Sequence, residues 1–490
     1  MTGQPELKKA WILAALMLTM VLAAMDVTIV STVIPQIVGD LGGFKKFSWV
    51  FSAYLLVQTA SIPLYGKLSD LYGRKLVLVI GISIFIMGSV TSAVSWNIDA
   101  LIVFRALQGL GAGAIMATVN TIAGDIYTLE ERGRIQGWLS SMWGISAIAG
   151  PALGGAIVKY ATWHWIFLIN IPFGLIAIVI LLVFFKENIV VHKHKIDYAG
   201  AILIFATLSI LIILLLNGGE SWPWFSFETF ILLFIVIALS YVTYTVEQKV
   251  ESPIMPLYLW KNKAFFTSTV AMTGMGIIMM GPQTYLPTFT QASLGFGVVI
   301  SGFILASTSI GWPAASALSS KIYLKTGFRN TALIGIILVL LACAGFLLVS
   351  WPQSIPVLII HQVLLGAGFG LISTPVLVGV QNMVDWNQRG VVTGAVLFGR
   401  NLGQSIGAAV YGAIFNTSLV LSMQTSAHEF PSDSDNILDI LLSPELTEQA
   451  KEFLQQTINS AYSNIYYGML LFSVFVLIAL ILMPKKLGKL

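Results

Sequence analysis

The chain has 490 residues, of which 57% are hydrophobic and only 10% are charged. Soluble domains are about 45–50% apolar and about 25% charged, so this composition excludes an ordinary soluble enzyme. The net charge of +4 is spread over many short loops, and no basic face indicates nucleic-acid binding. The single cysteine, Cys343, excludes an intramolecular disulfide and a thiolate metal cluster.

Apolar stretches long enough to cross a membrane recur along the whole chain. About 20 apolar residues cross the hydrocarbon core as a helix, because a helix satisfies its backbone groups internally. We therefore predict an all-α polytopic membrane protein with about fourteen spans. The predicted spans are roughly residues 10–34, 47–66, 76–95, 100–124, 135–158, 164–185, 198–217, 227–247, 265–290, 298–321, 331–350, 356–380, 392–414 and 461–483.

The loops on the two sides of the predicted membrane differ in charge. An even number of spans puts both termini on one side, and most of the 26 basic residues lie in loops on that side. Cytoplasmic loops carry an excess of Lys and Arg, so we expect both termini in the cytoplasm. The long hydrophilic stretch at about 416–460 then lies outside, either as a solvated tether or with an amphipathic helix at 444–458.

The chain contains an internal repeat. LQGLGAG at 107–113 is echoed by LLGAGFG at 364–370, and the loop at 66–75 has a weaker copy at 320–329, at a nearly equal offset. Two packed halves around a central site are the usual design of secondary transporters. We predict a six-helix bundle at 1–185, two inserted membrane helices with flanking loops at 186–262, and a second six-helix bundle at 263–490 that includes the outer loop.

The loop between the second and third predicted spans reads GKLSDLYGRK at 66–75. Its two glycines permit a tight turn, and Asp70 can cap a helix N-terminus. The loop resembles the signature of the major facilitator superfamily, and the chain is similar over almost its whole length to that superfamily's drug:proton antiporter family with fourteen helices. The resemblance implies a cytoplasmic latch that holds the halves together when the protein opens outward, although these residues are alternatively ordinary interfacial ones. The latch residues are Gly66, Asp70, Gly73, Arg74 and Asp125.

Two charged residues lie inside predicted spans of the first half, in stretches similar to motifs of the same family. These are Asp26 in LAAMDVTIVSTVIPQ and Arg105 in LIVFRALQGLGAG. A charge within a span is costly, so both side chains should face the protein interior and be paired. From the helical rise, Asp26 lies ~13 Å and Arg105 ~9 Å from the outer ends of their helices, which is a similar depth. We predict that Asp26 is the proton-coupling carboxylate and that Arg105 tunes its pKa or exchanges with the proton; the alternative is a static ion pair.

The fifth predicted span is rich in glycine and contains a proline. It is similar to the antiporter motif of exporters in the superfamily, although Ser146 stands where that family usually has Gly. Glycines let helices pack closely, and a proline removes a backbone hydrogen bond. The resemblance implies export rather than import, and the alternative is general small-residue packing. The motif residues are Gly137, Gly150, Pro151, Gly154 and Gly155.

Methionine, aromatic and amide side chains in several spans suggest a substrate cavity. Flexible thioethers and aromatic rings suit a cavity that accepts many shapes, but such residues also serve in packing or face lipid. Arg400 lies in a stretch similar to a late motif of the family. It either binds an anionic group or has a structural role, donating hydrogen bonds to the backbone of an unwound helix. His361 is expected to be buried and neutral, with a second proton site as the alternative. The predicted cavity residues are Asp26, Gln58, Trp143, Met275, Gln283, Tyr285, Arg400 and Asn401.

Together these patterns predict a proton-coupled antiporter that exports small lipophilic or cationic compounds by alternating access, as in multidrug efflux. The alternative is an exporter or importer of a specific metabolite, lipid or anion on the same fold. We find no catalytic cluster and no metal-ligand spacing, so we predict that the protein is not an enzyme. We expect no cofactor besides the proton gradient. The expected partners are the substrate, protons and the lipid bilayer, for a monomer that the resemblance places in a bacterial plasma membrane.

Overall fold

The computed structural model describes residues 6–42, 46–187, 197–218, 222–250, 253–348, 354–424, 448–486 and 488. In these residues all the regular elements are helical, which confirms the all-α prediction. The acidic part of the predicted outer loop, at 425–447, lies outside the described residues. The elements are α1 Glu6–Leu41, α2 Phe47–Tyr72, α3 Arg74–Ala93, α4 Ile98–Ile126, α5 Leu129–Tyr160, α6 Trp165–Leu168, α7 Asn170–Phe184, α8 Tyr198–Asn217, α9 Phe227–Glu247, α10 Leu257–Lys261, α11 Lys263–Ala292, α12 Val298–Ala306, α13 Thr308–Thr326, α14 Phe328–Leu348, α15 Ile355–Met383, η2 Trp386–Gln388, α16 Arg389–Gln424 and α18 Glu448–Leu482.

Twelve helical segments among the described residues are long and apolar enough to cross a membrane. Two of them are interrupted: α6 and α7 together form one, and α12 and α13 together form another. Helices α2 and α16 also follow predicted spans and are 26 and 36 residues long, but neither is among these twelve. The polytopic architecture is confirmed, whereas a total of fourteen spans stays a prediction.

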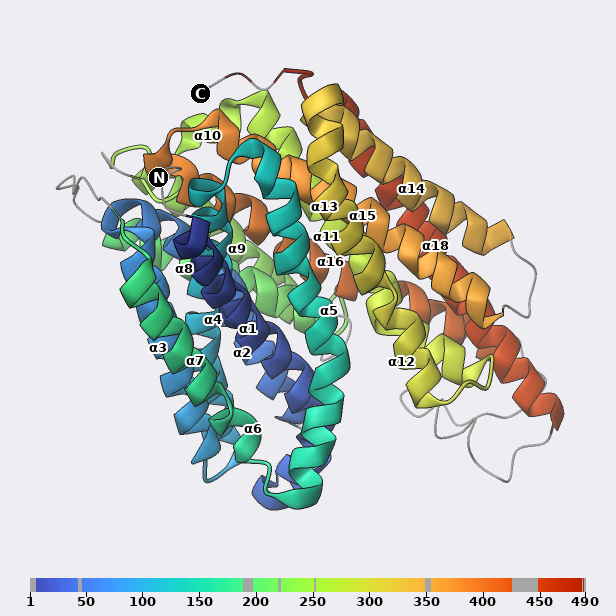
Figure 1. Ribbon diagram of the computed structural model, residues 1–490. Coiled ribbons are helices and arrows are strands. Elements are labelled where there is room, and N and C mark those ends of the chain that lie inside the picture. The colour runs from blue at the N-terminus through green and yellow to red at the C-terminus, as the bar shows by residue number, and fades with distance from the viewer. Residues whose placement is uncertain are drawn as a thin grey trace.

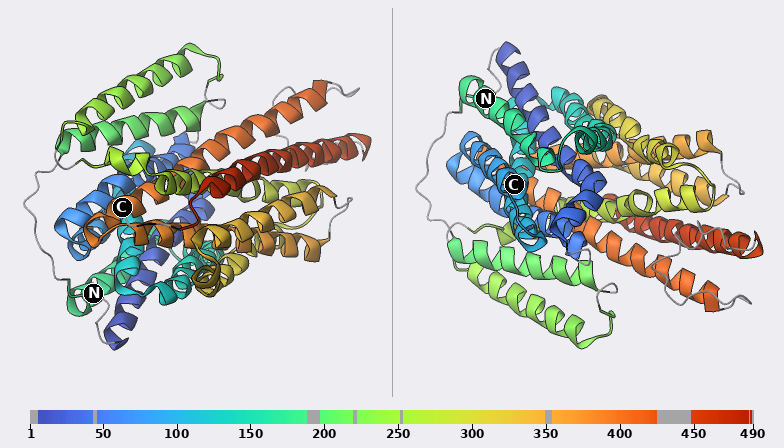
Figure 2. Two further views of the ribbon diagram at one scale, coloured as in Figure 1. Left: turned by 90° about the horizontal axis from the view of Figure 1, so that it is seen from above. Right: turned by 90° about the horizontal axis from the view of Figure 1, so that it is seen from below.

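The helices pack as two bundles with a separate pair beside them (Figures 1 and 2). In the first bundle α4 packs against both α2 and α3, and α1 packs against α5 and α7. In the second bundle α15 packs against α13 and α14, while α11 packs against α16 and α18. Helices α8 and α9 pack on each other and reach the bundles mainly through α2. Each bundle has its own apolar core, and the boundaries at 185 and 262 stay predictions.

The bundles touch mainly along two helix pairs, α5 with α13 and α2 with α16, and α4 also contacts α16. Small residues bring α5 close to α13: a Cβ on Gly133 would lie 2.7 Å from Ser320, and a Cβ on Gly144 would lie 2.5 Å from Ser309. Further along α5, Gly150 and Gly154 face α1 instead. The bundles therefore meet at the end of the molecule that carries both termini and diverge at the opposite end (Figure 1).

Candidate transport site and interface latch

Asp26 on α1 and Arg105 on α4 form an ion pair inside the first bundle. Arg105 Nη1 lies 2.5 Å from Asp26 Oδ2, and both side chains are completely buried. Arg105 Nε also donates to the carbonyl of Val50 at 3.3 Å, and the guanidinium lies 4.3 Å from the centre of the Tyr54 ring. The structure thus brings together the two intramembrane charges that the sequence places at similar depth.

Three amide and hydroxyl side chains complete the surroundings of Asp26. Gln108 Nε2 donates to Asp26 Oδ1 and to Ser89 Oγ, both at 2.7 Å. Asn170 Nδ2 lies 3.1 Å from Ser89 Oγ and 3.4 Å from Asp26 Oδ1. Sequence analysis missed all three. Gln108 follows Arg105 by one helical turn and so was recognisable, whereas Ser89 and Asn170 come from other helices.

This network supplies hydrogen-bond donors to both oxygens of the buried carboxylate. Desolvating two ions is offset only when their remaining polar atoms are also hydrogen-bonded, and both oxygens of Asp26 have donors. One Arg105 nitrogen, Nη2, is buried with no partner among the described residues. Asp26 is therefore the charge that compensates the buried guanidinium of Arg105.

The signature loop gathers a second group of charges at the other end of the bundle. Arg74 is completely buried; its Nη2 lies 2.6 Å from Asp70 Oδ1 and its Nε lies 2.9 Å from Asp125 Oδ2. Gly73 joins α2 to α3 with φ 92, a conformation that favours glycine. The Arg74 guanidinium also lies 3.5 Å from the centre of the Trp386 ring, which belongs to the second half.

The acids of this group bind the start of α16. Asp70 accepts hydrogen bonds from the backbone N–H groups of Gly390 at 2.8 Å and Val391 at 2.9 Å. It therefore caps a helix N-terminus, as its residue type suggested, but the helix belongs to the opposite half. Asp125 Oδ1 lies 2.5 Å from Arg389 Nη1. The loop sequence holds no signal for Arg389, because this contact depends on how the halves pack.

Gly66 completes the contact between the halves. A Cβ on Gly66 would lie 2.5 Å from the carbonyl oxygen of Gly390, so α2 and α16 cross at backbone distance. The structure brings together all the predicted latch residues and adds Trp386, Arg389 and the first turn of α16. From here on, the word latch means the ionic group Asp70, Arg74, Asp125 and Arg389. This group omits the two predicted glycines and adds Arg389.

The glycines of the fifth predicted span join α5 to two neighbours. A Cβ on Gly150 would lie 2.1 Å from Thr28 Oγ1, and a Cβ on Gly154 would lie 2.2 Å from Thr32 Oγ1, both on α1. Gly137 faces α13, where its Cβ would lie 2.8 Å from the carbonyl of Pro313. The other two motif residues differ, since Pro151 is exposed and Gly155 has no neighbour within 4 Å.

We expect alanine at position 150 to destabilise the protein and to lower transport, whereas alanine at position 155 should do neither. The new methyl group would lie 2.7 Å from Thr28 Cβ, which cannot rotate away. Overpacking of this kind costs about 1–3 kcal/mol. Thermal unfolding and efflux of Gly150→Ala and Gly155→Ala, measured side by side, test the expectation; equal behaviour of the two variants would contradict it.

The predicted cavity residues do not gather on one exposed surface. Met275 lies in the core of the second bundle, Gln58 is 4% exposed and Asp26 is 2% exposed, so none of the three lines an open cavity in this conformation. Helix packing covers them, which residue type alone does not reveal. The other predicted members are at least partly exposed: Trp143, Gln283, Tyr285, Arg400 and Asn401. 

His361 is buried in the second bundle. Its Nδ1 lies 3.2 Å from Gln362 Nε2, and its ring lies beside the stacked rings of Phe346 and Tyr466, with centroid distances of 5.4 and 5.3 Å. Gln362 stands where the repeat places Arg105 in the first half. No acid of the second half that the structure describes forms an ion pair there, so the coupled charges Asp26 and Arg105 belong to the first half alone.

Two helical bundles rich in membrane spans, joined at one end through a charged latch, define a multi-pass membrane transporter. The chain matches the model of the Major Facilitator Superfamily over residues 16–408. It belongs to this family, and it is a secondary transporter rather than an enzyme.

Several bacterial relatives are similar over most of their length. The chain is 33% identical over 417 residues to multidrug resistance protein 3 of Bacillus subtilis (strain 168), covering 84% of this chain and 81% of that protein. It is 30% identical over 513 residues to the multidrug transporter protein MdtP of the same organism, covering 98% and 94%. It is 31% identical over 413 residues to the multidrug efflux pump SdrM of Staphylococcus aureus (strain N315), covering 84% and 90%.

A solved structure shares the fold. The crystal structure of the human organic anion transporter MFSD10 matches with a TM-score of 0.64 over 97% of this chain and 100% of that chain. The two sequences are 15% identical, so the likeness concerns the fold alone.

Proposed function

We propose that the chain is a proton-coupled antiporter of the drug:proton family with fourteen helices and that it exports small lipophilic or cationic compounds. The observation that carries the proposal is Asp26, a completely buried carboxylate inside a membrane-embedded bundle, paired with Arg105. A carboxylate at such a position is costly unless it has a role, and proton relay is the common role in transporters. The printed names of the bacterial relatives support the substrate class.

The packing supports a route from this pair to the interface between the halves. Protonation neutralises Asp26 and weakens its hold on Arg105, which frees α1 to shift against α4. Helix α1 packs on α5 through Gly150 and Gly154, and Thr28 Oγ1 donates to the carbonyl of Ser146 at 2.9 Å. Helix α5 in turn forms the longest contact with the second bundle, along α13. A shift of α1 would therefore be passed through α5 to the α5–α13 interface between the halves.

The conformation fits one stage of alternating access. The halves are closed at the end that carries the termini and diverge at the other end (Figure 1). With both termini in the cytoplasm of a bacterial cell, as the loop charges favour, this is the outward-facing stage. Asp26 is then buried at this stage and does not face the space on the diverging side. Trp143 and Gln283 are exposed candidates for substrate contact.

Transport into proteoliposomes tests the coupling. We expect an imposed pH gradient to drive ethidium movement by the purified protein, and collapse of the gradient to stop it. Ethidium movement that ignores the gradient would contradict the proton coupling. Movement of an anionic dye in place of ethidium would favour the alternative, an anion or metabolite transporter, in which Arg400 would serve the substrate.

A further inference from the structure

A groove of about 480 Å³ lies between α9 and α10. It is at the end of the molecule that carries both termini (Figure 1). None of its residues belongs to the latch or to the surroundings of Asp26. The lining residues are Tyr244, Glu247, Gln248, Leu257, Tyr258, Trp260 and Lys261.

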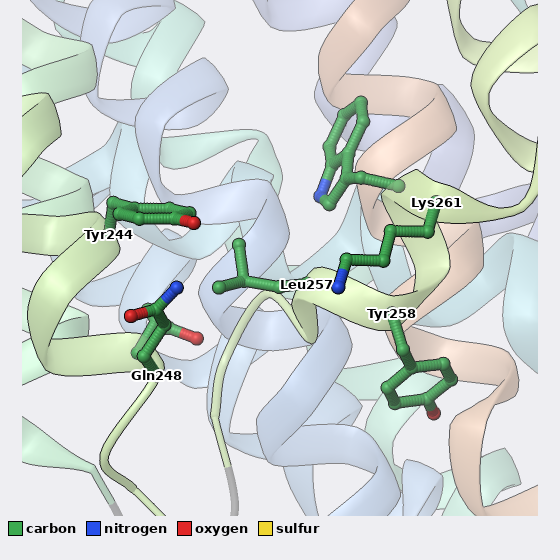
Figure 3. A pocket seen from close by; sticks show the side chains of 7 residues that line it. Tyr244, Gln248, Leu257, Tyr258 and Lys261 are labelled. Carbon is green, nitrogen blue, oxygen red and sulfur yellow. The ribbon is translucent and has the colours of Figure 1, made fainter.

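Hydrogen-bond donors converge over the apolar floor of this groove. Figure 3 shows the Tyr244 hydroxyl and the Lys261 ammonium pointing toward one another from opposite sides of Leu257, with Gln248 below Tyr244. Lys261 forms no ion pair with any residue that the structure describes. An ammonium, a phenol and an amide around an open space suit the oxygens of a phosphodiester, which prefers charge-assisted donors.

The one acid of the groove is already engaged by the chain. Glu247 is 4% exposed, and its two carboxylate oxygens accept hydrogen bonds from the backbone N–H groups of Ile254 and Met255, both at 3.2 Å. These bonds fix the segment that leads into α10 and so help to place Lys261 opposite Tyr244. Glu247 keeps its negative charge, but these bonds turn its oxygens toward the backbone, and Lys261 forms no ion pair with it or with any other acid among the described residues.

An exposed apolar stripe runs from the groove along α9. Its residues follow one another at intervals of three or four, so they share one helix face. From first to last they extend over about 21 Å, which exceeds the ~15 Å of hydrocarbon in one leaflet. The stripe consists of Phe230, Phe234, Ile237, Tyr241 and Tyr244, which are 58%, 72%, 60%, 69% and 49% exposed.

We infer that the groove binds the phosphodiester headgroup of a membrane phospholipid whose acyl chain lies along the stripe of α9. A free phosphate would share the chemistry of Lys261 and Tyr244, but it would make no use of the stripe. The junction of a polar groove with an apolar track of this length is complementary to a phospholipid. The inference concerns the inserted helix pair, and it stands whether or not the protein exports drugs.

Native mass spectrometry of the purified protein with added dioleoyl phosphatidylglycerol tests the site. We expect bound lipid, and about tenfold weaker binding by Lys261→Gln, which is the effect of losing one charge-assisted hydrogen bond. The matched control is Lys249→Gln, which removes an exposed lysine of the same region outside the groove and should bind as the wild type does. Tyr244→Phe removes only a hydroxyl, so it decides the matter if Lys261→Gln does not fold.

Two further ligands separate the sources of binding. Dioleoylglycerol, which has the acyl chains without the phosphate, should bind more weakly than the phospholipid, and millimolar inorganic phosphate should not displace the phospholipid. Equal binding of dioleoylglycerol would overturn the headgroup site. Displacement by inorganic phosphate would show a free-anion site instead, and equal losses in Lys261→Gln and Lys249→Gln would show a general effect of surface charge.

Discussion

Proton-driven efflux is expected to be lost when Asp26 is replaced by asparagine, while the protein still inserts into the membrane. Asparagine keeps the size of the side chain and an oxygen for Arg105, but it cannot take up and release a proton. The measurement is ethidium transport in proteoliposomes under an imposed pH gradient, with the amount of inserted protein determined in the same preparation. Asp99→Asn is the matched control, because Asp99 is an exposed acid paired with Lys46 at the end of the bundle away from the termini.

The same substitution separates a proton carrier from a static ion pair. Removing one partner of a buried pair costs about 3–5 kcal/mol, because the other charge stays buried without compensation. Asp26→Asn should therefore unfold at a lower temperature, and the double variant Asp26→Asn/Arg105→Gln should recover part of this loss without recovering transport. Full gradient-driven efflux by either variant would remove Asp26 from the mechanism.

Replacement of Asp125 by asparagine is expected to shift the protein away from the conformation seen here. Asp125 joins two arginines, Arg74 at 2.9 Å and Arg389 at 2.5 Å, and only the second lies in the opposite half. Because every 1.4 kcal/mol changes an equilibrium about tenfold, even part of a buried pair's energy would alter the populations visibly. Efflux by Asp125→Asn should also fall, because the transport cycle needs the conformation seen here and the variant populates it less.

Spin labels at the diverging ends measure this shift. Tyr160 ends α5 and Val299 is the second residue of α12, and both are exposed, at 80% and 71%. With cysteines at these positions in a Cys343→Ser background, we expect shorter label distances in Asp125→Asn than in its parent. Lys46→Gln is the control, since it breaks an exposed pair that contributes only about 0.2–1 kcal/mol. Unchanged distances in Asp125→Asn would show that the latch does not set the conformation.

Local patterns and the cost of charge in a membrane predicted part of this site. Asp70 and Arg74 lie in one predicted loop, so a turn brings them into contact. Asp26 and Arg105 lie at similar depth in the membrane, and the cost of an unpaired charge there predicted that each would be paired. Partners on other helices could not be predicted, because Ser89, Asn170 and Arg389 meet the site only through packing. The cavity stays a prediction, because residue type does not tell whether a methionine such as Met275 faces a core or a cleft, and in this conformation Met275 lies in the core.

The Asp70 contact has a consequence for opening of the closed end. Asp70 binds the first N–H groups of α16, so separation of the halves strips that helix of its cap as well as breaking an ion pair. Loss of a cap costs about 1 kcal/mol unless other acceptors replace it. At the moment of opening those acceptors are water molecules, which makes hydration of the α16 terminus a requirement for the switch and links its rate to water activity on that face.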